Sequence, residues 1–111
     1  MTRDFNKVRR IVVKIGTNIL TKNGGVDVAY VRRVARQISS LLATGRQVVV
    51  VSSGAIGMGA DQLDVTGKVT NIKVRQACAA IGQPLLMQEY RKSFLRHGIT
   101  VAQVLLTAEV I

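Results

Sequence analysis

Two runs of β-branched residues flank a helical pattern near the start of the chain, and this order constrains the fold more than any other feature. The runs are residues 11–13 (IVV) and 47–51 (QVVVV). Neither alternates apolar with polar residues, which predicts strands buried on both faces, as in a parallel sheet covered by helices. Between them, apolar residues at three- and four-residue spacing predict a helix over 27–44. The order strand, helix, strand predicts one βαβ unit.

Short polar segments mark where these elements begin and end. Residues 21–27 (TKNGGVD) contain an Asn followed by two glycines and predict a turn, with Asp27 as the N-cap of the helix. Gly45 predicts the end of the helix, because glycine readily adopts the left-handed conformation that follows many helices.

In the second half of the chain, the sequence predicts one loop, another helical region and one more strand. Residues 52–59 (SSGAIGMG) predict a glycine-rich loop, and 61–70 an exposed, mobile connection. Residues 71–97 have a helical pattern that Gly82 and Pro84 are expected to interrupt or kink. Residues 100–106 (TVAQVLL) predict a third strand.

Polar residues and glycines directly follow both of the first two predicted strands. Lys14 precedes Gly16, Thr17 and Asn18 after the first strand, and Ser53, Gly54 and Ala55 follow the second. Parallel strands end at one edge of a sheet, where α/β proteins bind ligands, so the two loops are predicted to face one cleft. Backbone N–H groups, a hydroxyl, an amide and a lysine charge are groups that bind anions. The sequence therefore predicts an anion site, without naming the anion.

A simpler structural explanation exists for each of these features. The glycines at 54, 57 and 59 could allow close packing of a helix on a strand, and Lys14 could simply extend to solvent. We favour the anion site, because a charge at the end of a buried strand is costly unless a ligand or an acidic partner meets it. Two familiar phosphate motifs are absent: no G-x-G-x-x-G follows a strand, and Gly67-Lys68 lacks the first Gly and the Ser or Thr of a Walker loop.

Composition excludes several classes of protein. Sixteen Lys and Arg against six Asp and Glu give a net charge of +10, but the cations are scattered and only four aromatic residues are present, so nucleic-acid binding is not expected as the main role. No apolar run approaches the roughly 18 residues of a membrane span, and no secretory signal is evident, so we expect a cytoplasmic protein. The single cysteine, Cys78, excludes an internal disulfide and is expected to be buried.

Four blocks of the sequence are similar to one known family. They are 11–21 (IVVKIGTNILT), 48–59 (VVVVSSGAIGMG), 75–90 (RQACAAIGQPLLMQEY) and 98–107 (GITVAQVLLT). In this order and at similar spacing they resemble the N-terminal part of the amino acid kinase family, in its glutamate 5-kinase branch, and the similarity covers essentially residues 8–111. The Ser-Ser-Gly-Ala after the second strand discriminates within the family, because acetylglutamate and uridylate kinases have a glycine triplet there.

The resemblance implies ATP-dependent phosphorylation of the γ-carboxylate of L-glutamate, the first step of proline synthesis. It implies a catalytic Lys14 that contacts the ATP phosphates, nucleotide contacts from Gly16, Thr17 and Asn18, and glutamate contacts from Ser53, Gly54 and Ala55. Asn18 stands where relatives often have Ser. The implied cofactors are ATP and Mg²⁺, with no metal ligand expected within these 111 residues.

The fold implied by the resemblance is a three-layer αβα sandwich with a mainly parallel sheet, incomplete in this chain. Residues 1–111 are expected to be the N-terminal part of a single domain, with 1–8 as a flexible lead-in and the nucleotide-binding half absent. The chain alone is expected to be inactive. The expected partners are L-glutamate, ATP and further copies of the full-length enzyme, and neither a membrane nor nucleic acid. The alternatives are another amino acid kinase acting on a different carboxylate or phosphate, and a basic phosphate- or RNA-binding module without catalysis.

Overall fold

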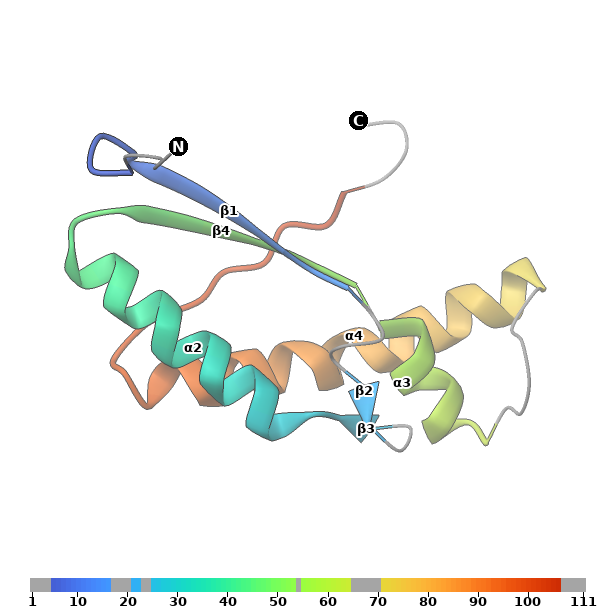
Figure 1. Ribbon diagram of the computed structural model, residues 1–111. Helices are drawn as coiled ribbons and strands as arrows, with labels where there is room; N and C mark the ends of the chain where they lie inside the picture. Colours follow the sequence, from blue (N-terminus) through green and yellow to red (C-terminus); the bar gives the residue numbers. More distant parts are fainter. Residues whose placement is uncertain (1–4, 17–20, 23–24, 54, 65–70, 107–111) are drawn as a thin grey trace.

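A parallel βαβ unit forms the first half of the structure. The computed structural model describes residues 5–16, 21–22, 25–53, 55–64 and 71–106. Strand β1 (Arg10–Ile15) pairs in parallel with β4 (Gln47–Ser52), and helix α2 (Val28–Ala43) connects them (Figure 1). In the register of this pair, Arg10 lies opposite Gln47 and Ile15 opposite Ser52. The predicted unit is therefore confirmed, with the bounds of α2 and β4 within one residue of those expected, while β1 extends two residues past the IVV run to Ile15.

Both predicted ends of α2 are also confirmed. The carboxylate of Asp27 accepts a hydrogen bond from the Tyr30 N–H at 3.1 Å, which satisfies one of the free donors of the first turn. At the other end, Gly45 has φ +86° and donates its N–H to the Leu42 carbonyl at 3.0 Å. Within the predicted turn that precedes α2, β2 (Thr21–Lys22) and β3 (Gly25–Val26) form a short antiparallel pair.

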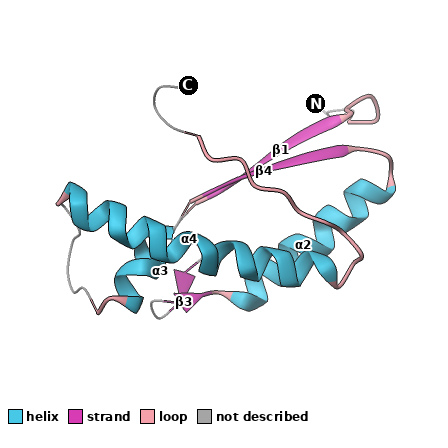
Figure 2. Ribbon diagram, turned by 180° about the vertical axis from the view of Figure 1, so that it is seen from behind, coloured by secondary structure: helices cyan, strands magenta, loops and turns pink. Residues whose placement is uncertain are grey.

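The sheet is covered on one face only, so the prediction of strands buried on both faces is wrong. Helices α2 and α4 (Ile72–Leu95) lie on the same side of the β1–β4 pair in two opposite views (Figures 1 and 2). Along β1, Val13 and Ile15 pack into the core, while Val12 is 64% exposed. Along β4, Val49 and Val51 are exposed as well. Among the described residues no second layer covers this face, and a three-layer sandwich stays a prediction.

The second half of the chain is more helical than expected. The predicted loop over 52–59 is wrong for most of its length, because β4 includes Ser52 and α3 (Ala55–Gln62) begins at Ala55 and takes in the first two residues of the predicted mobile connection. Helix α4 is continuous through Pro84, so the predicted interruption is wrong too, while a kink there stays a prediction. Packing accounts for the glycines of α3 and α4, since the two helices are in backbone contact. A Cβ at Gly59 would overlap the Cys78 carbonyl, and one at Gly82 would overlap the Ala55 carbonyl.

The ends of α4 follow ordinary capping rules. Asn71 is the N-cap, and its side-chain oxygen accepts from the N–H of Lys73 at 2.9 Å. At the C-terminus, Gly98 has φ +71° and donates to Leu95, while Ile99 donates to Phe94, which is the Schellman pattern. Cys78 is fully buried, as predicted.

The predicted third strand at 100–106 is not present in the structure. Ile99 and Val101 pack against the core, but the segment pairs with none of the described strands, and its last three apolar residues, Val104, Leu105 and Leu106, are 80%, 68% and 61% exposed. An apolar sequence can favour extended backbone, but it forms a strand only where a neighbouring edge offers hydrogen-bond partners.

The core lies between the covered face of the sheet and the helices. Its buried members are Ile15, Val31, Ala35, Ile38, Met58, Leu86, Tyr90 and Phe94. At the amino ends of the strands, Arg46 donates to the carbonyls of Val8 and Phe5 at 3.1 and 3.0 Å. The flexible lead-in over 1–8 stays a prediction, and residues 1–4 are outside the described part. No helix in the described part of the chain has the length and apolar character that a membrane crossing requires.

Candidate functional site

The carboxyl ends of β1 and β4 lie side by side and bring the two predicted loops to one edge of the sheet. Ile15 and Ser52 are directly paired, so Gly16 and Ser53 each follow at the same level. Both residues are exposed. Ala55, the third residue of the second predicted group, opens α3. Thr17, Asn18 and Gly54 are outside the described residues, and the binding role of each of these positions stays a prediction.

Lys14 lies on the open face of the sheet, next to this edge. It pairs in register with Val51, and both residues are exposed on the side away from the helices. The argument that a buried strand end makes the Lys14 charge costly is therefore wrong, because water reaches this side chain. Within the described ranges no carboxylate forms an ion pair with it, and the ammonium group is available to an anion at the strand ends.

The glycines of this region serve different purposes. Gly59 is explained by close packing of α3 on helix α4, not by the packing of a helix on a strand proposed as the simpler alternative, and close packing does not explain Gly16 or Gly57. A Cβ at either of these two positions would have no heavy atom within 4 Å. At Gly16 the space beside the backbone is open, which suits a loop whose N–H groups approach a ligand closely.

The N-terminus of α3 is a feature that the sequence analysis missed. The first turn of a helix has N–H groups without intrahelical partners and the positive end of the helix dipole. Because α3 begins two residues after Ser53, these groups lie at the carboxyl end of β4. The glycines of residues 54–59 indicated a loop. Gly59 instead allows α3 to pack on α4, and this contact is visible only in the structure.

A hydrogen bond between Ser52 and Tyr90 is the second missed feature. The Tyr90 hydroxyl lies 2.8 Å from Ser52 Oγ, although 38 residues separate the two in sequence. Burial raises the pKa of Tyr90, and the hydrogen bond to Ser52 offsets part of this increase. The spacing of Leu86, Tyr90 and Phe94 on one face of α4 indicated a buried stripe, but no sequence signal pointed to Ser52.

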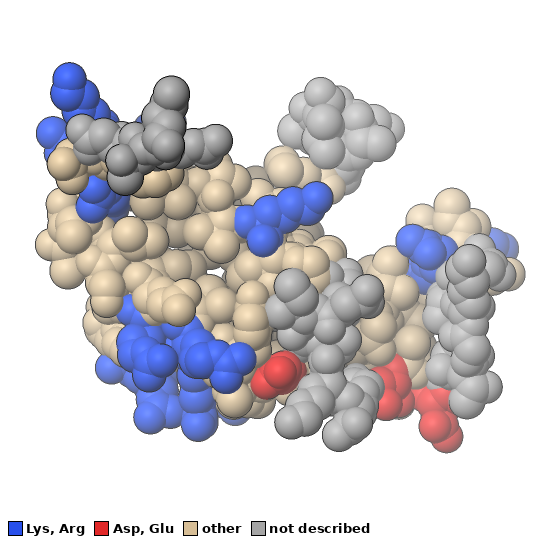
Figure 3. Space-filling view, viewed as in Figure 1, with Lys and Arg blue, Asp and Glu red and all other residues tan. Residues whose placement is uncertain are grey.

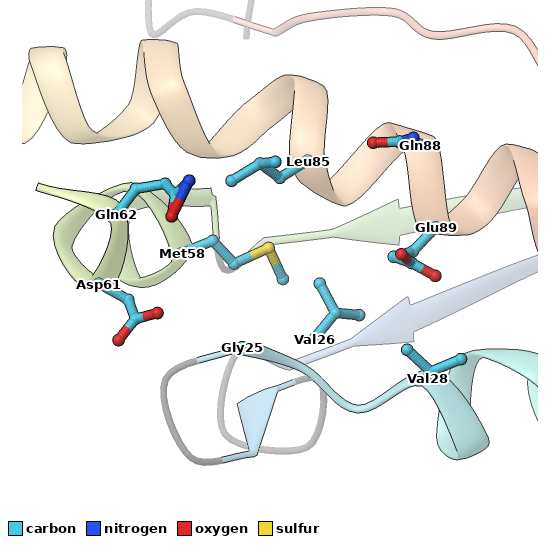
Figure 4. A pocket seen from close by; sticks show the side chains of 9 residues that line it. All are labelled: Gly25, Val26, Val28, Met58, Asp61, Gln62, Leu85, Gln88 and Glu89. Carbon is cyan, nitrogen blue, oxygen red and sulfur yellow. The ribbon is translucent and has the colours of Figure 1, made fainter.

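A separate pocket of about 230 Å³ lies between β3, α3 and α4. In Figure 4, Met58 of α3 and Leu85 of α4 extend toward each other across it, with Val26 below them. Asp61 and Glu89 are on its rim. Of the predicted site residues that the structure describes, none lines this pocket. In the part of the chain that the structure describes, no three His, Cys, Asp or Glu side chains come together to hold a metal ion.

Charge is unevenly distributed over the surface. Figure 3 shows Lys and Arg gathered over the outer side of α2 and acidic residues near α3 and the β2–β3 hairpin. Arg32, Arg33 and Arg36 of α2 are exposed, and the Arg33 guanidinium lies 5.6 Å from the Tyr30 ring centre. Glu89 and Lys92 form an ion pair at 3.9 Å. The basic face of α2 is thus solvated, as expected for the polar side of an amphipathic helix.

Comparison with known proteins assigns the chain to a family. The model of the amino acid kinase family matches residues 9–111. The chain is similar to the glutamate 5-kinases of Pelobacter propionicus (50% identity over 106 residues, 95% of this chain and 28% of the relative) and Methanosarcina barkeri (46% over 113 residues, 95% and 30%). It is 45% identical over 101 residues to that of Thermus thermophilus, covering 91% of this chain and 27% of the relative. The chain spans less than a third of the length of these relatives. It belongs to the amino acid kinase family.

Proposed function

We propose that this chain supplies one side of the active site of a glutamate 5-kinase, which transfers the γ-phosphoryl group of ATP to the γ-carboxylate of L-glutamate. The observation that supports this most directly is the pairing of Ile15 with Ser52. It places the loop after Lys14 and the loop after Ser52 at one edge, so that two anionic reactants can meet there. The similarity to relatives named glutamate 5-kinase is the reason for proposing L-glutamate as the phosphoryl acceptor. The reaction would be the first step of proline biosynthesis.

The chemistry of acyl phosphate formation suits this arrangement. An oxygen of the γ-carboxylate attacks the γ-phosphorus, the new O–P bond forms as the bond to the ADP oxygen breaks, and ADP departs with the electron pair. Both reactants are anions, so catalysis depends on positioning them and on neutralising the charge between them. Lys14 would supply the positive charge for the phosphoryl group and Gly16 a close backbone approach. Ser53 and the first turn of α3 would orient the carboxylate.

Magnesium would accompany the nucleotide and offset phosphate charge. The described residues do not form a site for it, because no three acidic, His or Cys side chains come together. Its ligands, and the adenine and ribose contacts, are therefore expected elsewhere in the enzyme. Assembly into a homo-oligomer and a cytoplasmic location are parts of the same proposal.

Steady-state kinetics on the longest polypeptide encoded by the reading frame of this chain tests the proposal. ADP release that depends on L-glutamate is expected. N-acetylglutamate and aspartate are assayed beside it for comparison as acceptors. Lys14→Ala should lower kcat by about 10²–10³-fold, the usual effect of losing a group that stabilises transition-state charge. Lys92→Ala removes another exposed lysine, which pairs with Glu89, and should leave kcat unchanged. Preference for another acceptor, or full activity without Lys14, would contradict the proposal.

A further inference from the structure

Tyr90 extends from α4 to the carboxyl end of β4. Its side chain is buried, with 5% of the residue surface exposed, and its ring stacks on Phe94 with centroids 6.4 Å apart. This packing fixes the ring, and the hydroxyl lies 2.8 Å from Ser52 Oγ. Since Ser52 is the last residue of β4, the hydrogen bond lies directly before the loop that begins at Ser53.

Ser52 Oγ has a second, longer polar contact, at 3.4 Å from the carbonyl oxygen of Ser53, in which only the serine hydroxyl can donate. In the shorter contact with Tyr90 either hydroxyl can be the donor. The result is a short chain of hydrogen bonds from the Tyr90 hydroxyl through Ser52 to the backbone of Ser53. Burial keeps the pKa of Tyr90 above its ordinary value, so the hydroxyl retains its proton at neutral pH.

Helix α4 also contacts the residue that follows this loop, Ala55 at the start of α3. Gly82 approaches the Ala55 carbonyl so closely that a Cβ at this position would overlap it. Ser53 therefore lies between two residues, Ser52 and Ala55, that are both held by α4. A helix that contacts both sides of a short loop determines how the loop residues face the edge of the sheet.

We propose that Tyr90 is a positioning residue, which orients Ser53 through Ser52 and thereby sets the affinity for the carboxylate acceptor. The inference rests on the proposed function, in which Ser53 binds that acceptor. Tyr90 itself is on the covered side of the sheet and contacts the loop, so the nucleotide side, where Lys14 and Gly16 lie, should be insensitive to it.

Kinetics on the longest polypeptide of the reading frame tests this inference. Tyr90→Phe keeps the ring and removes the hydroxyl, and should raise KM for L-glutamate about three- to tenfold, the range for one lost hydrogen bond. KM for ATP should stay within about twofold. Ser52→Ala should raise KM for L-glutamate by a similar factor, whereas Ser52→Thr, which keeps the hydroxyl, should have the wild-type KM. The double variant Ser52→Ala, Tyr90→Phe should have a KM for L-glutamate no higher than that of either single variant. Tyr30→Phe is the matched control and should change neither KM.

Two results would overturn the inference: equal changes in both KM values, or a lower melting temperature with unchanged KM for L-glutamate. A wild-type enzyme without activity on L-glutamate would instead overturn the proposed function. In that case NMR of the 111-residue chain decides whether the loop is anchored. Tyr90→Phe should shift the amide signals of Ser53 and Ala55, Tyr30→Phe should not, and unshifted signals in Tyr90→Phe would refute the anchoring.

Discussion

Gly82 of α4 lies against the backbone carbonyl of Ala55, with no room for a side chain between the two helices. Gly82→Ala should therefore separate α3 from α4 and lower the free energy of unfolding by about 1–3 kcal/mol, the usual cost of overpacking. Gly57→Ala is the matched control, because Gly57 is also within a helix but has open space around it. It should raise stability by about 0.5–1 kcal/mol. Urea denaturation measures both, and equal stabilities for the two variants would contradict the observed packing.

The buried hydroxyl of Tyr90 makes stability depend on pH in alkaline solution. Burial raises its pKa in the folded state above the ordinary value of 10.0. The unfolded chain therefore loses this proton first as the pH rises, and the stability linked to it, fully present below pH 10.0, is lost as the pH increases through the folded pKa. Urea unfolding midpoints are measured between about pH 8 and 11, a range that brackets the ordinary tyrosine pKa of about 10. They should fall less steeply with pH for Tyr90→Phe than for wild type or Tyr30→Phe. Equal slopes in all three proteins would argue against a buried, protonated Tyr90.

Lys14 and Ile15 are neighbours on β1 with opposite environments. Lys14 is exposed on the open face, while Ile15 is 3% exposed and packs in the core. Lys14→Ala should change the free energy of unfolding by no more than about 0.5 kcal/mol, as is usual at exposed positions. Ile15→Ala should lower it by about 2–5 kcal/mol through the cavity it creates. Thermal and urea unfolding of both variants would show whether the kinetic effect of Lys14→Ala is separate from stability, and a large loss of stability in Lys14→Ala would refute this separation.

The elements that could be predicted from the sequence are those determined by local patterns. The βαβ unit follows from two β-branched runs around a helix of 3.6-residue periodicity, and both ends of α2 follow from Asp27 and Gly45. The proximity of Gly16 and Ser53 was predictable as well, because parallel strands end at a common edge. Each of these inferences needs only residues that are close in sequence or a rule of topology.

The features that were missed depend on contacts between distant residues. A β-branched run does not show which of its faces is covered, and Val12 and Val49 proved to be exposed. Glycines that suggested a loop over 52–59 instead allow α3 to pack on α4. The Ser52–Tyr90 hydrogen bond joins residues 38 positions apart, and the segment at 100–106 lacks the neighbouring strand that its sequence favours.

The open face of the sheet gives a direct test of the predicted three-layer fold. Val49 is 50% exposed in this chain, so Val49→Thr should change the stability of the 111-residue protein by no more than about 0.5 kcal/mol. If further elements of a longer polypeptide cover this face, the same substitution there buries a hydroxyl and should cost about 1–3 kcal/mol. Val50→Thr, on the side facing the core, is the control and should be costly in both proteins. An equally small effect of Val49→Thr in both would indicate that no second layer forms.

The isolated 111-residue chain is expected not to phosphorylate glutamate. It has Lys14, Gly16 and Ser53 at one edge of the sheet, but its described residues form no site for the magnesium that accompanies ATP. Phosphoryl transfer requires both reactants to be held in line, and losing the contacts to one of them removes most of the rate enhancement. A coupled assay of ADP release, run on the purified chain and on the longest polypeptide of the reading frame, should show glutamate-dependent turnover only in the latter. Turnover by the 111-residue chain would mean that these residues form a complete active site by themselves.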